Sequence, residues 1–430
     1  MMEGSFRASL TRRLLVVRPN GLHFGHLGLE LLTAYAEARS ARAAVCLVEP
    51  SHLANPALLH LTPDGVRVFR WPGWTAALVV PRLWTIGLGH RLRVRWRRGI
   101  DGLKDDAADA LRDHIDGTPM PASLRARLRR LRSALARRTG PSRAYIRVRE
   151  TYYRRRAIRA PVRVTMPAAA HAEAEAAIAG LGIAPGQPMV AIHAREPGFK
   201  QAGLEVQAKA ASRQGAGLRD DSLRNSRIGL YRTAVDRLRA AGYAVVRLGD
   251  SSMSALDWPG VPDLATLPGA SPSLQVYCLL RSRFLVAGES GPSAVAMLTN
   301  TPILTVNATD AIGSYPVRRE GLMLLKHVVD RRDGRVLTPL ELLTEDYYTH
   351  LRDPGRFEYR ENTSGEIDRA VVEMLQRLDG AGDSAAQVGF RTAAEEAAGR
   401  LRDRFAYVRK WGTDDGFLGD GAMVFFTGAE

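Results

Sequence analysis

The sequence predicts an α/β protein with two lobes, each built on a parallel β-sheet that is wound by helices on both sides. In the first lobe, an apolar run at 13–19 is followed by a glycine-containing turn, a helical pattern at 27–38 and a second apolar run at 43–49. This order is typical of a strand–helix–strand unit with parallel strands. In the second lobe, apolar runs of strand length alternate with helical patterns over 170–306, which is typical of a doubly wound sheet.

The expected elements of the second lobe follow one another in regular order. Its strands are the apolar runs at 188–192, 243–248, 283–287 and 302–306. Its helices are the patterns at 171–181, 228–241, 273–280 and 291–298, and a further amphipathic helix is expected at 366–378. We therefore expect three parts: a Rossmann-like lobe with a basic insert at 1–165, a second Rossmann-like lobe at 166–335, and a helical extension at 336–430 that packs back on the lobes.

The chain of 430 residues carries 61 lysines and arginines against 45 acidic residues, a formal net charge of +16. This charge favours acidic partners such as phosphates, nucleotides or anionic lipids. The cysteines, Cys46 and Cys278, lie far apart in apolar runs, which excludes a disulfide scaffold and suits a reducing compartment. No apolar run approaches the ~20 residues of a membrane-spanning helix, and the first residues lack a signal-peptide pattern. We expect a cytoplasmic protein.

Two arginine-rich segments leave alternatives open. The segment 74–98 begins at Trp74 with apolar residues and ends in arginines up to Arg98. It is either a peripheral contact with the inner face of the membrane or a core element followed by a basic surface loop. The segment 125–138 either binds nucleic acid or membrane, or is a solvated amphipathic helix. We favour the second interpretation of each segment and expect no nucleic-acid partner.

Chemistry in such sheets lies in the loops that follow the carboxyl ends of the strands. The first of these loops contains Gly25, His26 and Leu27. Glycine lets a ligand approach the backbone closely, and a histidine can act as a general base near neutral pH. His26 is therefore either a catalytic base or a residue that caps the helix or bonds a neighbouring loop.

The loop after the strand at 188–192 gathers several charged side chains, His193, Arg195, Glu196 and Lys200. Arg195 and Lys200 can hold a diphosphate, the arginine through two parallel hydrogen bonds. Glu196 can act as a base or bind a sugar hydroxyl. The alternative is a structural cluster of salt bridges.

Two further loops predict an anion site. Arg224 and Asn225 precede a helical pattern, and an arginine beside the positive end of a helix is costly unless an anion is present. The segment 288–294 (GESGPSA) follows a strand and opens a helix, so its free amides can cradle a phosphate. The alternatives are an ordinary helix cap and a simple glycine-serine turn. The candidate anion site is completed by Glu289, Ser290, Gly291, Ser293 and, after the next strand, Asn307.

Several common motifs are absent from the sequence. It contains no Asp-x-Asp pair of the kind that holds a metal against a diphosphate, and no P-loop pattern. It also lacks the G-x-S-x-G elbow of α/β-hydrolases, and no strand is followed by G-x-G-x-x-G. A P-loop NTPase, an α/β-hydrolase and a nicotinamide-binding lobe are therefore not indicated.

The joint order of the motifs resembles a bacterial family of glycosyltransferases. A strand ends in His-x-Arg at 193–195, a Ser-Leu-Arg-Asn segment at 222–225 precedes a helix, and a Gly-Asp pair ends the next strand at 249–250. A Ser-Gly turn at 290–291 then opens a later helix. Two shorter segments, Gly-His-Leu at 25–27 and Glu-Asn-Thr at 361–363, also look like family features. The likeness covers most of the second lobe and patches elsewhere.

The resemblance implies a GT-B fold, in which two Rossmann-like lobes face each other across a cleft. The Glu-Ser-Gly-Pro turn is similar to the Asp-Ser-Gly-Pro donor loop of heptosyltransferases, with Glu289 in place of the acid. The His-x-Arg strand end is similar to that of GDP-fucose-dependent fucosyltransferases, although Glu196 stands where they have a second arginine. Enzymes of this fold generally need no metal, in agreement with the missing Asp-x-Asp pair.

The resemblance thus implies a glycosyltransferase that moves a sugar from a nucleotide-diphosphate sugar to a hydroxyl of a glycan, lipid-linked or small-molecule acceptor. We expect transfer without a metal or other cofactor and with inversion of the anomeric centre. The expected base is His26 or Glu196. The donor is expected to meet His193, Arg195, Lys200, Arg224, Asn225, Glu289, Ser290, Gly291, Ser293 and Asn307. Two other functions stay open: a nucleotide-sugar epimerase on the same scaffold, and a non-enzymatic basic protein that binds membrane or nucleic acid.

Overall fold

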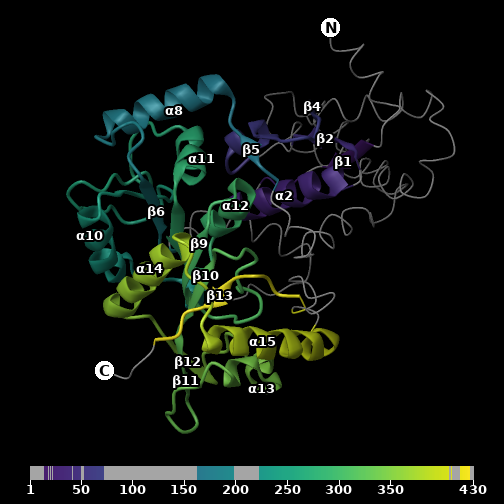
Figure 1. Ribbon diagram of the computed structural model, residues 1–430, viewed down its shortest axis with the longest axis vertical. Helices are drawn as coiled ribbons and strands as arrows, with labels where there is room; N and C mark the ends of the chain where they lie inside the picture. Colours follow the sequence, from purple (N-terminus) through teal and green to yellow (C-terminus); the bar gives the residue numbers. More distant parts are fainter. Residues whose placement is uncertain are drawn as a thin grey trace, which may run out of the picture. The chain divides into compact units, whose positions relative to one another are not determined.

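The computed structural model describes residues 14–17, 19, 21, 23–40, 42–49, 53–71, 162–197, 222–405, 408 and 417–426. The chain divides into two compact units (Figure 1). The first comprises Met1–Tyr153 and Ala160–Thr165, and the second comprises Arg154–Arg159 and Met166–Glu430. The segments 74–98 and 125–138 and the residue Lys200 lie outside the described residues, so their predicted roles stay predictions.

The first unit contains a parallel sheet of three strands in the order β1-β2-β4. Strand β1 (Leu14–Val17) leads into helix α2 (Phe24–Ser40), which is followed by β2 (Ala44–Val48) and β4 (Val68–Trp71). The 3-10 helix η1 (Pro56–His60) precedes β3 (Thr62–Pro63), which pairs with β5 (Val164–Thr165).

Helix α2 explains why this segment packs on the sheet. Leu27, Leu31 and Tyr35 recur at four-residue spacing and are fully buried, and the residues between them are buried as well, which is the pattern of a helix enclosed by protein on most sides. The helix contacts both β1 and β2. The strand–helix–strand order expected from the sequence is therefore confirmed.

The second unit is built on a six-stranded sheet in which all neighbouring strands are parallel. In spatial order its strands are β13 (Ala422–Met423), β10 (Leu322–Leu325), β9 (Ile303–Ala308), β8 (Phe284–Ala287), β6 (Met189–His193) and β7 (Ala244–Arg247). Strands β6, β7 and β8 are buried along their whole length, which explains their largely apolar sequences. The four strands expected from the sequence are present, and the parallel α/β class is confirmed.

Helices pack on both faces of this sheet (Figure 1). On one face, α10 (Arg232–Ala240) and α14 (Ser364–Leu378) pack on each other and share a core with Val190 and Ile192 of β6. Elsewhere α11 (Pro272–Arg281) contacts β6, and α12 (Gly291–Thr299) contacts β8 and β9. Helix α8 (Ala168–Gly180) packs on α11, and α15 (Ala385–Arg404) packs on β13. The tail expected to be helical thus also contributes a strand to the sheet.

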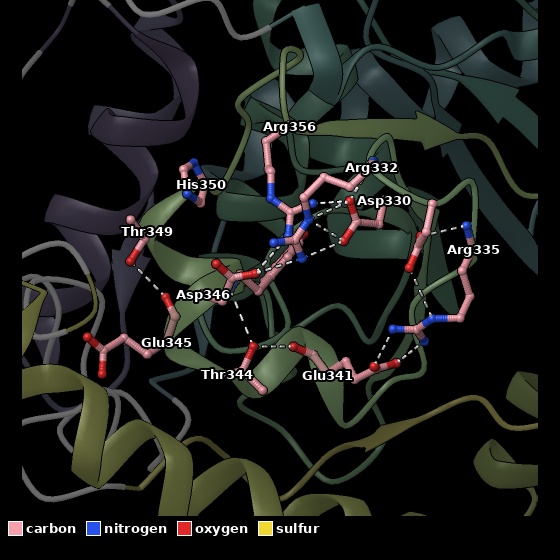
Figure 2. A network of polar contacts seen from close by, with 12 residues as sticks. Asp330, Arg332, Arg335, Glu341, Thr344, Glu345, Asp346, Thr349, His350 and Arg356 are labelled. Carbon is pink, nitrogen blue, oxygen red and sulfur yellow. Dashed lines mark hydrogen bonds and ion pairs between the residues drawn. The ribbon is translucent and has the colours of Figure 1, made fainter.

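The second unit also contains a two-stranded antiparallel hairpin of β11 (His327–Asp330) and β12 (Phe357–Arg360). Between its strands lie the 3-10 helix η5 (Glu341–Leu343) and helix α13 (Glu345–Thr349). Figure 2 shows a network of ion pairs around these elements, which we call the hairpin network. Its central members are Asp330, Arg332, Arg335, Glu341, Asp346 and Arg356.

The structure bears on two expectations from the sequence, one about membrane-spanning helices and one about the cysteines. Among the helices that the structure describes, none is long and apolar enough to cross a membrane. Both cysteines are buried free thiols, and burial raises the pKa of the Cys278 thiol to about 12. Buried thiols of this kind are inert packing groups rather than nucleophiles.

Candidate functional site

The order of the strands marks one point of the six-stranded sheet for ligand binding. Strand β7 lies on one side of β6, whereas β8, β9 and β10 follow on the other side. In open parallel sheets, ligands bind beyond the carboxyl ends of the strands where the order reverses, which here is between β6 and β8. We call this place the carboxyl edge. It is formed by residues at or just beyond the ends of the strands, above all Arg195, Gly288, Glu289, Ser290 and Asn307, the last of which lies within β9.

Arg195 lies just beyond β6 and is only 8% exposed. Its Nη1 donates a hydrogen bond to Oδ1 of Asn225 at 2.9 Å, and its backbone carbonyl accepts one from the Ser226 amide at 3.0 Å. The segment 222–226, which includes the 3-10 helix η3 (Ser222–Arg224), therefore lies against the end of β6. The structure thus brings together Arg195 and Asn225, two residues that the sequence predicted for one site.

Arg224 connects the same segment to the end of β8. Its Nε and Nη2 both donate to the backbone carbonyl of Glu289, at 2.9 and 2.7 Å. The guanidinium therefore lies at the residue just before the N-cap of α12. The sequence argument placed this arginine beside the helix that follows it in the chain, whereas the structure places it beside the start of α12, some 65 residues further on. The electrostatic argument for an anion holds at this new location.

The start of α12 offers backbone amides to an anion. Ser290 is the N-cap residue, but its side chain makes no capping hydrogen bond. Ser293 Oγ donates to the Gly288 carbonyl at 2.8 Å and lies 3.4 Å from Ser290 Oγ. The amides of a first helical turn carry partial positive charge and have no partner within the helix. Gly291 and Ser293 therefore lie in a turn that suits a phosphate group.

Glu289 holds this region together. Its carboxylate accepts hydrogen bonds from the Thr309 and Asp310 amides, from two hydroxyls and from Arg352 Nη2 at 3.0 Å. Burial alone would raise its pKa, but the Arg352 and Arg224 guanidiniums and the hydroxyls of Ser314 and Thr309 outweigh it and leave the pKa below its ordinary value. Glu289 is therefore an ionised carboxylate whose described contacts fix protein loops.

Asn307 is likewise engaged with the protein. It has a positive φ of 55°, which a side chain of this kind tolerates better than most. Its amide donates to Oδ1 of Asn362 and its Oδ1 accepts from the Asn362 amide, both at 2.7 Å. This reciprocal pair joins the end of β9 to the segment before α14. Both Asn307 and Glu289 lie at the predicted site, but as residues that shape it.

The structure gives Glu196 a structural partner. Its Oε1 accepts a hydrogen bond from Nη2 of the fully buried Arg247 at 2.5 Å, and its Oε2 accepts one from the Ser254 amide at 2.8 Å. Arg247 also pairs with Asp263 at 3.2 Å. Both carboxylate oxygens of Glu196 therefore accept hydrogen bonds from the protein. The salt bridge that the sequence offered as the alternative is present, and the role of Glu196 as catalytic base stays a prediction.

His193, the last residue of β6, is a buried neutral side chain. Its Nδ1 lies 3.0 Å from the Leu248 carbonyl, so Nδ1 carries the proton and Nε2 is left as an acceptor. Burial lowers its pKa to about 4. His26 lies on α2 of the first unit, where its ring is 5.2 Å from that of His23. Its predicted role as base stays a prediction.

Two cations of the carboxyl edge escaped the sequence analysis. Lys326 follows β10, is 5% exposed, and donates from Nζ to the carbonyls of Leu223 and Asn225. Arg352 binds Glu289 and, through Nε, Thr309 Oγ1 at 3.1 Å, from a backbone position with φ 63°. Lys326 comes directly after an apolar run, which is a signal that could have found it. No local pattern marks Arg352.

The described residues contain no group of three or more histidine, cysteine or acidic side chains placed to hold a metal ion. No family model and no curated protein matches the sequence.

Solved structures share a distant likeness in chain path. A glycosyl transferase family 9 protein from Veillonella parvula is 9% identical, with a TM-score of 0.42 over 85% of this chain and 97% of that one. The Escherichia coli ADP-heptose lipopolysaccharide heptosyltransferase II is 13% identical, with a TM-score of 0.41 over 86% and 100%. The fucosyltransferase NodZ from Bradyrhizobium is 15% identical, with a TM-score of 0.28 over 68% and 95%. Scores of this size carry nothing about activity.

Proposed function

We propose that this protein is a glycosyltransferase of GT-B type that binds a nucleoside-diphosphate sugar at the carboxyl edge and transfers the sugar to an acceptor hydroxyl. The observation that carries the proposal is the convergence of Arg195, Arg224 and the uncapped start of α12 beyond the adjacent strands β6 and β8. The motif order that resembles bacterial glycosyltransferases supports the same conclusion.

The chemistry follows from the charge that develops during transfer. When the bond between the sugar and the diphosphate breaks, negative charge grows on the departing phosphate. Fixed donors aimed at that charge lower the barrier without having to reorganise. The Arg195 and Arg224 guanidiniums, the first amides of α12 and the Ser290 and Ser293 hydroxyls supply such donors, and no metal is required for this step. His193, neutral at pH 7, offers an acceptor to a hydroxyl of the donor.

The remaining parts of the proposal concern the acceptor. The acceptor hydroxyl of a glycan, lipid-linked or small molecule attacks the anomeric carbon directly, which inverts its configuration. Because Glu196 is held by Arg247, His26 is the base that we propose. Product configuration, read by NMR from the anomeric coupling constant, tests the single displacement. A covalent glycosyl–enzyme adduct detected by mass spectrometry would contradict it.

A thermal-shift screen with UDP, GDP, ADP, CMP and dTDP tests the donor site. A nucleotide present at 100 times its Kd stabilises the fold by about 2.7 kcal/mol, an easily measured shift. We expect one nucleotide to stabilise the wild type and the control variant Arg335→Ala, which removes an exposed arginine of the hairpin network. We expect the same nucleotide to have little effect on Arg195→Ala. If the nucleotides stabilised all three proteins equally, or none of them, the proposed donor site would be contradicted.

A further inference from the structure

Lys326 is a buried cation whose contacts are unusual for its charge. It follows β10 directly, and its Nζ donates to the backbone carbonyls of Leu223 at 2.9 Å and of Asn225 at 3.0 Å. Both acceptors are uncharged. Burial lowers the pKa of this ammonium group, while Glu361 and Glu289 oppose that effect from nearby. Burying an ammonium group is expensive, so a plain structural anchor between a loop and a sheet does not require one.

The nearby carboxylates have cations of their own. Glu361 pairs with Arg227 at 2.6 Å, and Glu289 pairs with Arg352 at 3.0 Å. Lys326 instead donates its hydrogen bonds to the backbone carbonyls of Leu223, within η3, and of Asn225, the residue that follows η3. That short segment carries Arg224, which bonds the Glu289 carbonyl beside α12, and Asn225, which bonds Arg195. One buried side chain therefore fixes the backbone on which two residues of the candidate site are mounted.

We propose that Lys326 is a positioning residue of the donor site, which holds the segment 222–226 in the place where Arg224 and Asn225 build the diphosphate pocket. The inference rests on the proposed function. In this proposal Lys326 does not contact the ligand. Arg224 and Asn225 of the segment 222–226 make the contacts, and Lys326 holds that segment in place. Removal of the ammonium group frees the carbonyls of Leu223 and Asn225 and lets the segment leave the sheet. Arg224 then loses its alignment on α12, and Arg195 loses its amide partner.

The variant Lys326→Met tests the inference, because methionine keeps the length and the apolar stem of lysine and removes the donors. We expect its affinity for the nucleoside diphosphate identified in the screen, measured by isothermal titration calorimetry, to fall by about tenfold or more. Losing even one hydrogen bond of a charged group has an effect of this size, and the variant loses two. Because the sheet and its helices are untouched, Tm without ligand should change little. In turnover assays KM for the donor should rise more than kcat falls.

The matched control is Arg281→Met. Arg281 Nη2 also donates to two backbone carbonyls, those of Ala184 and Gln187, but these lie before the start of β6, at the opposite end of the strands. Loss of either cation could lower nucleotide affinity simply by making the fold less stable. In that case Lys326→Met and Arg281→Met will lower the affinity equally, and the inference is overturned. We expect Arg281→Met to bind as the wild type does.

Hydrogen exchange separates this inference from the proposed function. In Lys326→Met, the amides at 222–226 should exchange faster than in the wild type even without nucleotide. If the wild type binds no nucleotide, the proposed function fails, and the exchange rates alone decide the role of Lys326. Unchanged exchange, or unchanged nucleotide affinity, contradicts it. Should Lys326→Met not fold, Lys326→Gln replaces it, because this side chain is polar but uncharged and one bond shorter than lysine: a folded variant with wild-type affinity contradicts the inference, and weakened affinity supports it.

Discussion

The carboxyl edge and the hairpin network are both rich in arginine, yet they use their charges in opposite ways. In the hairpin network, cations meet carboxylates: Arg335 pairs with Glu341 at 2.7 Å, and Arg356 bridges Asp330 and Asp346 (Figure 2). At the carboxyl edge, Lys326 donates to two carbonyls and Arg224 to a third, while Arg195 donates to an amide oxygen.

We interpret the difference as one between charges that hold the structure together and the charges of the proposed donor site. A carboxylate that accepts hydrogen bonds from a guanidinium neutralises the positive charge of that group and makes the surrounding surface more rigid. This is sufficient for a structural role. A neutral oxygen holds a cation in position without cancelling its charge, so that the positive field is still present for an anion. Glu289 is the exception at the edge: the Arg352 and Arg224 guanidiniums both act on this carboxylate, which organises the loops. Each prediction below changes a residue of one of these regions, or a matched control, and measures stability or nucleotide affinity.

The largest expected effect comes from acid. Because the His193 pKa is about 4 in the folded protein and 6.5 in the unfolded chain, the unfolded chain binds a proton first as the pH falls. Stability is therefore full above pH 6.5 and declines down to about pH 4, by about 3 kcal/mol from this group. We expect His193→Asn, which keeps a donor for the Leu248 carbonyl, to lose less stability between pH 7 and 4.5 in urea titrations. Parallel curves for the two proteins would contradict the burial of a neutral imidazole.

The hairpin network responds to acid in a lower range. Arg335 lowers the pKa of Glu341 to about 2, with help from hydrogen bonds of Thr338. A depressed carboxyl pKa gives stability that is present above about pH 4.5 and is lost only as the pH falls toward 2. Glu341→Gln lacks this contribution, so in urea titrations its stability should lie below that of the wild type by a constant amount between pH 7 and 5, and the two curves should converge below that range.

A second large effect is expected from the arginine at the end of β6. Arg195→Ala should lower the affinity for the nucleoside diphosphate by about 100-fold, because the variant loses a largely buried contact between a charged side chain and the ligand. Arg335→Ala, on the exposed side of the hairpin network, should leave the affinity within about twofold, as most surface ion pairs contribute little. Calorimetric titration of both variants provides the comparison. Equal losses would mean that net charge, rather than the edge, governs binding.

The reverse experiment breaks the hairpin network. Arg356→Met leaves Asp330 and Asp346 without one of their cations, so Tm should fall by several degrees while nucleotide affinity stays unchanged. Arg360→Met removes an exposed pair with Glu358 and should shift Tm far less. If Arg356→Met lowers affinity at constant Tm, the two regions are coupled and the contrast between them is wrong.

The smallest effect is expected at the start of α12. Ser293→Ala removes one hydroxyl contact with the Gly288 carbonyl and one potential donor to phosphate, at a cost of about 1 kcal/mol in binding. Helix α11 also opens with Pro-Ser, but its start is capped by the Ser271 side chain, which accepts from the Ser273 amide. Ser273→Ala is therefore the matched control and should bind nucleotide normally. If Ser273→Ala lost more nucleotide affinity than Ser293→Ala, the start of α12 would not be the phosphate site.

The sequence predicted the elements whose signal is local. Val190 and Ile192 lie in an apolar run bounded by polar residues, and such a run is a buried strand wherever the chain places it. The loops after β6 and β8 were found for the same reason, because parallel strands bring their carboxyl ends to one edge. Strand β13 has two residues, too few for any periodicity.

The site was predicted less completely because its contacts cross long stretches of chain. Glu196 and its partner Arg247 are 51 residues apart, and Arg224 meets Glu289 across 65 residues. Composition and spacing identify charged residues near strand ends, but they do not say which of them pair. That is why Glu196 was a candidate base in the sequence and a salt-bridge partner in the structure. Arg352 became visible only through its partners, whereas the apolar run before Lys326 is a local signal of a strand end.

The most direct test of the account is amide hydrogen exchange at the start of α12 with and without a saturating nucleoside diphosphate. We predict that the amides of Ser293 and Ala294 exchange more slowly in the complex, since they become hydrogen-bond donors to a phosphate oxygen. The amides of the hairpin network should keep their rates. A nucleotide that binds by calorimetry yet leaves the Ser293 and Ala294 amides unchanged would show that the anion site lies elsewhere, and the central claim would fail.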